Sequence, residues 1–192
     1  MQNLDPFEWK VVGKMGIATA VLGALFWLIL TFLFGGCATS GADPASGVPN
    51  LDQVEPGIWR GGQPKSAAAW AYLRGLGLTN DIKLNTDEEA SDQLAIDAGF
   101  RLFYFPIDTM EQLIEGPDPV AMSTALKALV PGTFVHCAHG QDRTGLLVGL
   151  YRLQERSNAA AAWCEMTNHG YHPALVGLTR FWESASRKRQ SE

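Results

Sequence analysis

The sequence predicts an α/β domain with a central, mostly parallel sheet flanked by helices. Between residues 51 and 187, short apolar runs alternate with amphipathic ones, and the last three amphipathic runs have no strand between them. Strands that alternate with helices favour a parallel sheet with helices on both faces. Ligands bind such sheets beyond the carboxyl ends of the strands. A site is therefore expected directly after the last predicted strand.

The individual elements follow from residue spacing. Extended runs are predicted at residues 57–60, 81–84, 101–105 and 133–136. Apolar residues recur at helical spacing in residues 66–76, 88–98, 119–129, 144–155, 159–168 and 175–187. Turn-forming residues, Ser157-Asn158 and then 170–173, separate the last three helices.

Composition limits the possible functions only in part. The chain has 192 residues and a net charge of −5, which suits one domain with an appendage and gives no global positive field to attract nucleic acid. We therefore expect no nucleic-acid partner. The three cysteines, Cys37, Cys137 and Cys164, are too few and too scattered for a disulfide framework or a four-thiolate metal site.

An uncharged stretch near the N-terminus predicts a membrane anchor. Residues 15–34 contain no charged side chain and would form about 30 Å of helix, enough to cross a bilayer. We assign residues 15–36 to the anchor and 1–14 to a cytoplasmic segment. Lys10 and Lys14 precede the stretch and no basic residue follows it before residue 50, so the positive-inside rule places the folded domain on the outer side.

The end of this stretch allows a second interpretation. Phe34-Gly35-Gly36-Cys37 resembles the signal of bacterial lipoproteins, in which small residues precede a cysteine that becomes lipidated. Either Cys37 carries a lipid or residues 15–34 remain as a transmembrane helix. Residues 37–50 are small, polar and rich in Gly, Pro and Ser, which predicts a flexible linker. The domain is then expected at 51–187, followed by a charged tail at 188–192.

The segment after the last predicted strand has the features of an anion site. It reads His136-Cys137-Ala138-His139-Gly140-Gln141-Asp142-Arg143-Thr144-Gly145 and leads into a predicted helix. A loop at a helix N-terminus presents unpaired N–H groups near the positive end of the helix dipole. Arg143, six positions after Cys137, can return across the loop to bind two oxygens of one anion. The same positive field would lower the pKa of the Cys137 thiol.

These residues resemble the Cys-x5-Arg-Ser/Thr phosphate loop of protein tyrosine and dual-specificity phosphatases. Residues 58–64, Ile-Trp-Arg-Gly-Gly-Gln-Pro, and the helix after the loop resemble the small atypical dual-specificity branch, so the similarity extends over residues 51–187. Residues 137–143 are called the phosphate loop below.

The resemblance implies a reaction in two steps, without metal or cofactor. Cys137 would displace the alcohol from a phosphomonoester to give a phosphocysteine, which water then hydrolyses. Arg143 would bind the phosphate together with the backbone of the intervening residues, Ala138, His139, Gly140, Gln141 and Asp142. The Thr144 hydroxyl would assist departure of the sulfur, and His136 would orient the loop and keep Cys137 ionised.

The leaving group of such a reaction needs a proton donor. The family uses an aspartate about thirty residues before the nucleophile, and Asp108 stands twenty-nine residues before Cys137, after a predicted strand. Asp108 is our candidate for the general acid. The alternative is that it caps a turn. Glu111, Asp118 and, inside the loop, Asp142 are other carboxylates near this chemistry.

The expected partners are a phosphorylated protein or a small phosphomonoester, and the membrane through the N-terminal segment. Ala138, His139 and Gln141 stand where phosphoinositide-directed relatives often have lysines, so a highly charged inositide is not favoured. Three alternatives stay open: a phytase-like enzyme, a phosphate-binding module without turnover, and a rhodanese-type sulfurtransferase. A metal site formed by His136, Cys137 and His139 matches no common zinc spacing.

Overall fold

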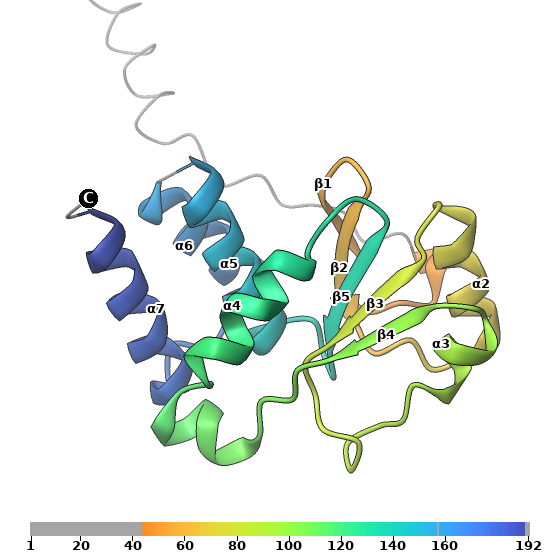
Figure 1. The fold of residues 1–192 in the computed structure, drawn as a ribbon, viewed down its shortest axis with the longest axis horizontal. Helices are drawn as coiled ribbons and strands as arrows, with labels where there is room; N and C mark the ends of the chain where they lie inside the picture. The colour runs from red at the N-terminus through yellow and green to blue at the C-terminus, as the bar shows by residue number, and fades with distance from the viewer. Residues whose placement is uncertain (1–43, 157, 191–192) are drawn as a thin grey trace, which may run out of the picture. The chain divides into compact units, whose positions relative to one another are not determined.

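The computed structural model describes residues 44–156 and 158–190. A five-stranded sheet lies between two groups of helices (Figure 1), and the strand order is β1-β2-β5-β3-β4. The strands are β1 (Asp52–Glu55), β2 (Ile58–Gly62), β3 (Asn80–Lys83), β4 (Arg101–Tyr104) and β5 (Thr133–Cys137). Only β1 runs antiparallel to its neighbour, while β2, β5, β3 and β4 are parallel. The predicted α/β fold is therefore confirmed.

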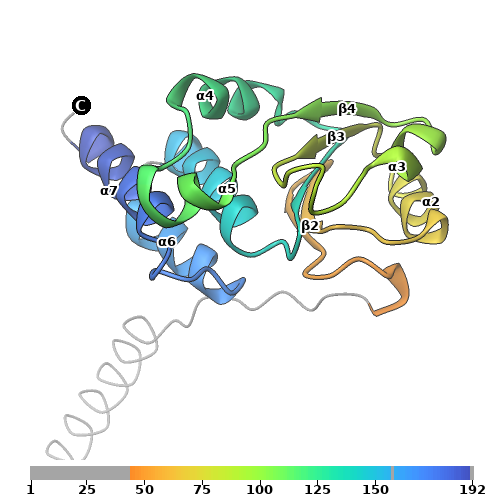
Figure 2. The ribbon, with the colours of Figure 1, turned by 90° about the horizontal axis from the view of Figure 1, so that it is seen from below.

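The helices cover both faces of this sheet. They are the short 3-10 helix η1 (Pro44–Ser46), α2 (Ala67–Gly75), α3 (Gln93–Asp97), the π-helix η2 (Glu111–Glu115), α4 (Pro119–Ala128), α5 (Asp142–Arg156), α6 (Ala159–Asn168) and α7 (Val176–Gln190). Figures 1 and 2 show α2 and α3 on one side of the sheet and α4 to α7 on the other. Side-chain caps start three of them: Ser66 at α2, Asp118 at α4 and Asn158 at α6.

Two apolar clusters hold the layers together. One contains Trp70, Leu73 and Phe134 on the α2 side, and the other contains Val135 and Leu146 on the α5 side. Successive residues of β5 point to opposite faces of the sheet. His136 accordingly lies on the same face as Phe134, against which its ring stacks with a centroid distance of 5.4 Å.

The parallel strands bring several chemically active residues to one edge of the sheet. Gly62, Lys83, Tyr104 and Cys137 are the last residues of β2, β3, β4 and β5. The register pairs Gly62 with Cys137, and Lys83 with His136. Because the carboxyl ends of parallel strands meet at the same edge, the segments that follow Gly62, Lys83 and Tyr104 surround the phosphate loop, which follows β5.

The start of the folded region differs from the prediction. Residues 44–50 were predicted to belong to the flexible linker, but Val48 is only 4% exposed and belongs to the α2-side cluster. The Pro49 carbonyl accepts a hydrogen bond from the Gly62 amide at 2.6 Å. These residues are therefore packed against the sheet. The edge strand β1 was not predicted, because Val54 is its only buried residue.

The segment before α3 also differs. A helix was predicted over residues 88–98, yet helical structure is confined to Gln93–Asp97. Residues 84–92 instead form turns around the buried ammonium group of Lys83, which contacts the Asp87 carboxylate and the Ala90 carbonyl. A long-range charge contact thus overrides the local helical spacing. We call residues 84–92 the β3–α3 segment.

The predicted membrane anchor at 15–36, the segment at 1–14 and the lipidation candidate Cys37 all lie outside the described residues. Within residues 44–156 and 158–190, no helix has both the length and the apolar character to span a bilayer.

Candidate active site

The Cys137 thiol lies at the carboxyl end of β5 and is almost wholly buried, with 2% exposure. It is a free cysteine. Burial alone would raise the pKa of this thiol, but the charge of Arg143 and hydrogen bonds from Thr144 and His139 outweigh burial and lower the pKa below its ordinary value. The thiolate is the nucleophilic form of cysteine. The surroundings of Cys137 therefore favour its reactive state.

The backbone of the phosphate loop is held from outside by its carbonyl groups. The carbonyls of Ala138, His139 and Gly140 accept hydrogen bonds from the Gln63 amide, the Asn50 side chain and the Arg60 guanidinium, respectively. Amides of His139 and Thr144 point instead toward the Cys137 sulfur. The carbonyls are thus turned outward and these amides inward, which is the arrangement that an anion site requires.

Gly140 is required by the close approach of this loop to β2. Its φ is +73°, and a Cβ added there would lie 2.4 Å from the backbone carbon of Gly61 and 2.5 Å from the Gly62 nitrogen. Any other residue would push the loop away from the strand. Glycine at this position therefore lets the loop rest directly on β2.

Arg143 lies in the first turn of α5, and its side chain is 7% exposed. Its Nη1 and Nη2 donate to the two carboxylate oxygens of Glu89, both at 2.7 Å, and Nη1 also donates to the Ile107 carbonyl at 3.2 Å. Within residues 44–156 and 158–190 its buried Nε has no hydrogen-bond partner, and the guanidinium also interacts with the Cys137 sulfur. Arg143 thus keeps one donor edge available beside Cys137.

Arg60 supports the loop from behind. It is fully buried on β2, and its Nη2 donates to the Gly140 carbonyl at 2.9 Å. Burial lowers the pKa of Arg60 to about 10, so the guanidinium remains charged at neutral pH. Its position indicates a role in the framework of the loop.

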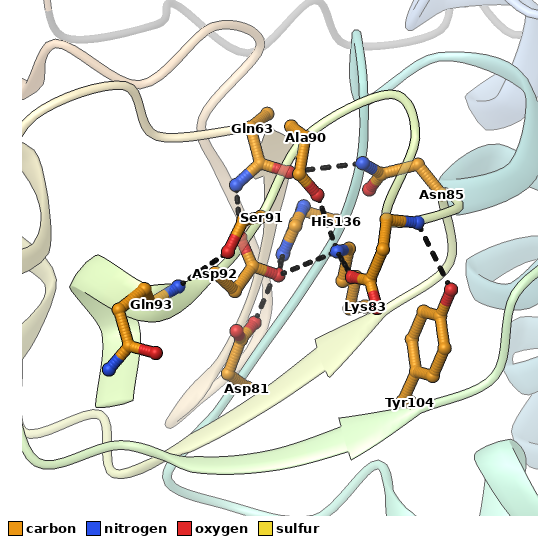
Figure 3. Close-up of polar contacts among 11 residues, drawn as sticks. Gln63, Asp81, Lys83, Asn85, Ala90, Ser91, Asp92, Gln93, Tyr104 and His136 are labelled. Atoms are coloured by element: carbon orange, nitrogen blue, oxygen red, sulfur yellow. Dashed lines mark hydrogen bonds and ion pairs between the residues drawn. The ribbon is translucent and has the colours of Figure 1, made fainter. Parts of the chain in front are cut away.

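His136 lies beneath the phosphate loop in a cluster of buried charged groups (Figure 3). Its Nε2 is 3.2 Å from Asp81 Oδ1 and 3.3 Å from Asp92 Oδ2, and Lys83 Nζ is 3.9 Å from the same Asp92 oxygen. Burial alone would lower the pKa of His136, but the two carboxylates raise it to about 10. Two cationic side chains, His136 and Lys83, therefore lie beside two carboxyl groups in a buried region.

The same cluster has the composition of a cation site, since ligand atoms of Asp81, Asp92 and His136 lie within 4.8 Å of one another. His136 faces both carboxylates, burial raises the pKa of the Asp81 carboxyl, and the Lys83 ammonium group lies 3.9 Å from Asp92. A metal ion would therefore have to displace a proton beside an ammonium group. The other histidines have separate partners: His169 contacts Asp52 and His172 contacts Asp142. Among the described residues, the one group of possible ligands consists of Asp81, Asp92 and His136 and includes neither Cys137 nor His139.

The hydrogen bonds of Asp108 are those of a helix cap. Its Oδ1 accepts from the Glu111 amide at 2.9 Å, and the Glu111 carboxylate accepts from the Asp108 amide at 2.8 Å, a reciprocal capping arrangement. Asp108 is nevertheless exposed and follows Ile107, whose carbonyl contacts Arg143. Its role as general acid remains a prediction that this position permits.

The other candidate residues divide by the direction of their side chains. Asp142 turns to the loop before α7, where its Oδ1 accepts from the His172 amide at 2.7 Å. The side chain of Gln141 packs against Gly170. His139 is exposed, whereas Thr144 is buried and its hydroxyl faces the thiol. Asp118 caps α4.

Sequence reasoning missed the residues that support this loop from other strands. Glu89, Lys83, Asp81 and Asp92 all lie between residues 81 and 92, more than forty positions before Cys137. One signal in the sequence could have pointed to them: the predicted strand at 81–84, which should be buried, contains two charged residues, Asp81 and Lys83. Buried charges are rare without partners.

Comparisons with known proteins agree with this geometry. Residues 48–169 match the model of the tyrosine phosphatase family, and this match covers more than half of the chain. Inositol diphosphatase DSP4 of Arabidopsis thaliana is 29% identical over 140 residues, which are 70% of each chain. Inositol diphosphatase DSP2 of rice (Oryza sativa subsp. japonica) is 28% identical over 121 residues, 60% of this chain and 56% of that protein.

Solved structures share the fold. TpbA of P. aeruginosa superposes with a TM-score of 0.63 at 21% identity, covering 81% of this chain and 96% of TpbA. The catalytic core of the PP-IP phosphatase SIW14 from S. cerevisiae gives a TM-score of 0.60 at 19% identity, covering 75% and 93%. With the loop geometry and the family match together, the chain belongs to the tyrosine phosphatase family and is a cysteine-dependent phosphatase of the tyrosine and dual-specificity type.

Proposed function

We propose that this phosphatase hydrolyses phosphomonoesters whose remaining part carries little negative charge, such as phosphotyrosine, with Cys137 as the nucleophile. The observation that carries the proposal is the pairing of a thiol of lowered pKa with a buried arginine, Arg143, whose Nε has no partner in the part of the chain that the structure describes. One group attacks phosphorus and the other holds its oxygens.

In the first step, the Cys137 thiolate forms a bond to phosphorus and the bond from phosphorus to the ester oxygen breaks. Asp108 gives its proton to the departing oxygen. In the second step, water attacks the phosphocysteine, Asp108 takes a proton from that water, and the sulfur leaves as a thiolate with the Thr144 hydroxyl donating to it. Inorganic phosphate is released and every group returns to its initial protonation state.

The charges near the loop favour a singly phosphorylated substrate. The phosphate loop carries one permanent cation, Arg143, with His139 as its only other basic residue. Besides the buried Asp92, the two segments that contact Arg143, residues 84–92 and 107–115, carry six carboxylates: Asp87, Glu88, Glu89, Asp108, Glu111 and Glu115. Each further phosphate on a substrate would meet these carboxylates and be repelled.

The similar proteins suggest a second candidate, because four of them, DSP1 to DSP4, are named inositol diphosphatases. Such a substrate carries many phosphates and needs several cations around the site. The small number of cations in the phosphate loop is the reason we place phosphotyrosine-type monoesters first and inositol phosphates second.

We expect residues 44–192 to hydrolyse a phosphotyrosyl peptide at least tenfold more efficiently, measured as kcat/KM, than phytate or an inositol pyrophosphate. Phosphate release at equal substrate concentration is the measurement. Cys137→Ser should abolish turnover of both, and full turnover by that variant would end the mechanism. A higher rate on the inositol substrates would reverse the assignment of substrate.

Replacement of the proposed acid should affect substrates according to their leaving group. We expect Asp108→Asn to lower kcat by about 100-fold for a phosphotyrosyl peptide and by less for p-nitrophenyl phosphate, because p-nitrophenolate departs without needing a proton. Glu115→Gln removes a charge from the same segment and is the matched control. Equal losses on both substrates would indicate that Asp108 serves only as the cap of the helix.

We also propose that residues 15–36 tether the domain to a membrane, with the domain on the outer side. The uncharged stretch at 15–34 and the placement of Lys10 and Lys14 before it support this location.

We expect external protease to digest the domain in spheroplasts of cells that express the full chain. Protection of the domain would place it in the cytoplasm. Incorporation of labelled palmitate that Cys37→Ser abolishes would distinguish lipidation from a retained helix.

A further inference from the structure

Some N–H groups of Arg143 bind Glu89 and Ile107, and the others are left for a substrate. A guanidinium has five N–H groups. Three are used by the protein: two on Nη1, for Glu89 and Ile107, and one on Nη2, for Glu89. The two that remain are the N–H of Nε, which has no partner among the described residues, and the second N–H of Nη2, while the guanidinium also interacts with the Cys137 sulfur. These two are adjacent on one edge, where they fit two oxygens of a phosphate.

We propose that Glu89 is a positioning residue that presets this edge of Arg143 for phosphate, and that buried Lys83 holds Glu89 in place through the β3–α3 segment. The inference rests on the proposed role of Arg143 in phosphate binding. Among the described residues, Glu89 contacts Arg143 and does not contact Cys137, so its effect is exerted through Arg143.

Lys83 gathers the β3–α3 segment around one ammonium group. Its side chain is fully buried and contacts the Asp87 carboxylate, the Ala90 carbonyl and the Asp92 carboxylate. Its Nζ also lies 5.2 Å from the centre of the Tyr104 ring, whose hydroxyl accepts from the Asp87 amide at 3.1 Å. Along the chain, Glu89 lies between Asp87 and Ala90, which both contact Lys83. The segment cannot move away without leaving a buried ammonium group unpaired, which is costly.

The far end of the same segment reaches the other end of the phosphate loop. Asp92 contacts His136, the residue before Cys137, and accepts a hydrogen bond from Gln63 (Figure 3). Gln63 in turn accepts from Asn85 at 3.1 Å. The β3–α3 segment therefore contacts residues at both ends of the phosphate loop, Arg143 through Glu89 and His136 through Asp92.

The effect of removing the Glu89 charge distinguishes positioning from simple electrostatics by its sign. As a negative charge beside the site, Glu89 repels a phosphate dianion, so neutralising it would strengthen phosphate binding. As a positioning residue, it keeps the donor edge of Arg143 aligned, so neutralising it would weaken phosphate binding. The two roles thus predict opposite changes of the same constant.

We expect Glu89→Gln to raise the inhibition constant of inorganic phosphate, and KM for p-nitrophenyl phosphate, by about tenfold, equivalent to ~1.4 kcal/mol. Glu89→Asp should recover part of this loss. Glu88→Gln, an exposed neighbour with the same charge change, should bind phosphate as the wild type does. An unchanged or lowered inhibition constant in Glu89→Gln, in a protein whose wild type turns over, would overturn the inference. Absence of wild-type turnover would instead refute the proposed function.

The role of Lys83 in holding the β3–α3 segment is tested by a double-mutant cycle that leaves Lys83 itself unchanged. The Asp87 side chain is 68% exposed, so Asp87→Asn weakens the ion pair between Lys83 and the β3–α3 segment without creating a cavity in the core. We expect it to raise the phosphate inhibition constant two- to fourfold alone, and to add nothing in the Glu89→Gln background. Additive effects, or no effect of Asp87→Asn alone, would contradict the proposal that Lys83 holds the β3–α3 segment in place. Lys83→Met, if it folds, should reproduce Glu89→Gln.

Discussion

The balance of charge beneath the phosphate loop is the constraint on which the site depends. Asp81, Asp92, His136 and Lys83 are all fully or nearly fully buried. Removing one partner of a buried ion pair costs about 3–5 kcal/mol, because the other charge is left without water or a counter-ion. The four side chains come from β3, from β5 and from the segment before α3. Their mutual neutralisation therefore ties three separate pieces of chain to the residue that precedes Cys137.

The local field at Cys137 is opposite in sign to the net charge of the protein. The chain carries −5 overall, yet the thiol is surrounded by Arg143, by inward amides and, behind the loop, by Arg60. Local groups dominate because the thiol is buried, where water screens charges least. The acidic segments around the loop then act mainly on whatever part of the substrate extends beyond the phosphate. In the function proposed above, the charges around the thiol serve catalysis, and the charges of the acidic segments serve substrate selectivity.

The prediction of secondary structure succeeded where local sequence and tertiary packing agree. The strands β2, β3, β4 and β5 and the helix α6 lie within two residues of their predicted ends. It was wrong at residues 88–92, where helical spacing is present but Lys83 holds the backbone in turns. It was also wrong at residues 44–50, whose Gly, Pro and Ser content is typical of a linker although Val48 reaches the core. In both places a distant contact decides the conformation.

The order of residues from His136 to Thr144 was sufficient to identify the chemistry, because a nucleophile, an arginine and a helix N-terminus that share one short loop must lie close together in any fold. Glu89, Lys83 and Asp92 could not be recognised in the same way. They lie far from Cys137 along the chain and approach it only because the parallel register places the ends of β3 and β5 side by side. Contacts within a loop follow from chain connectivity, whereas contacts between loops follow from how the sheet is assembled.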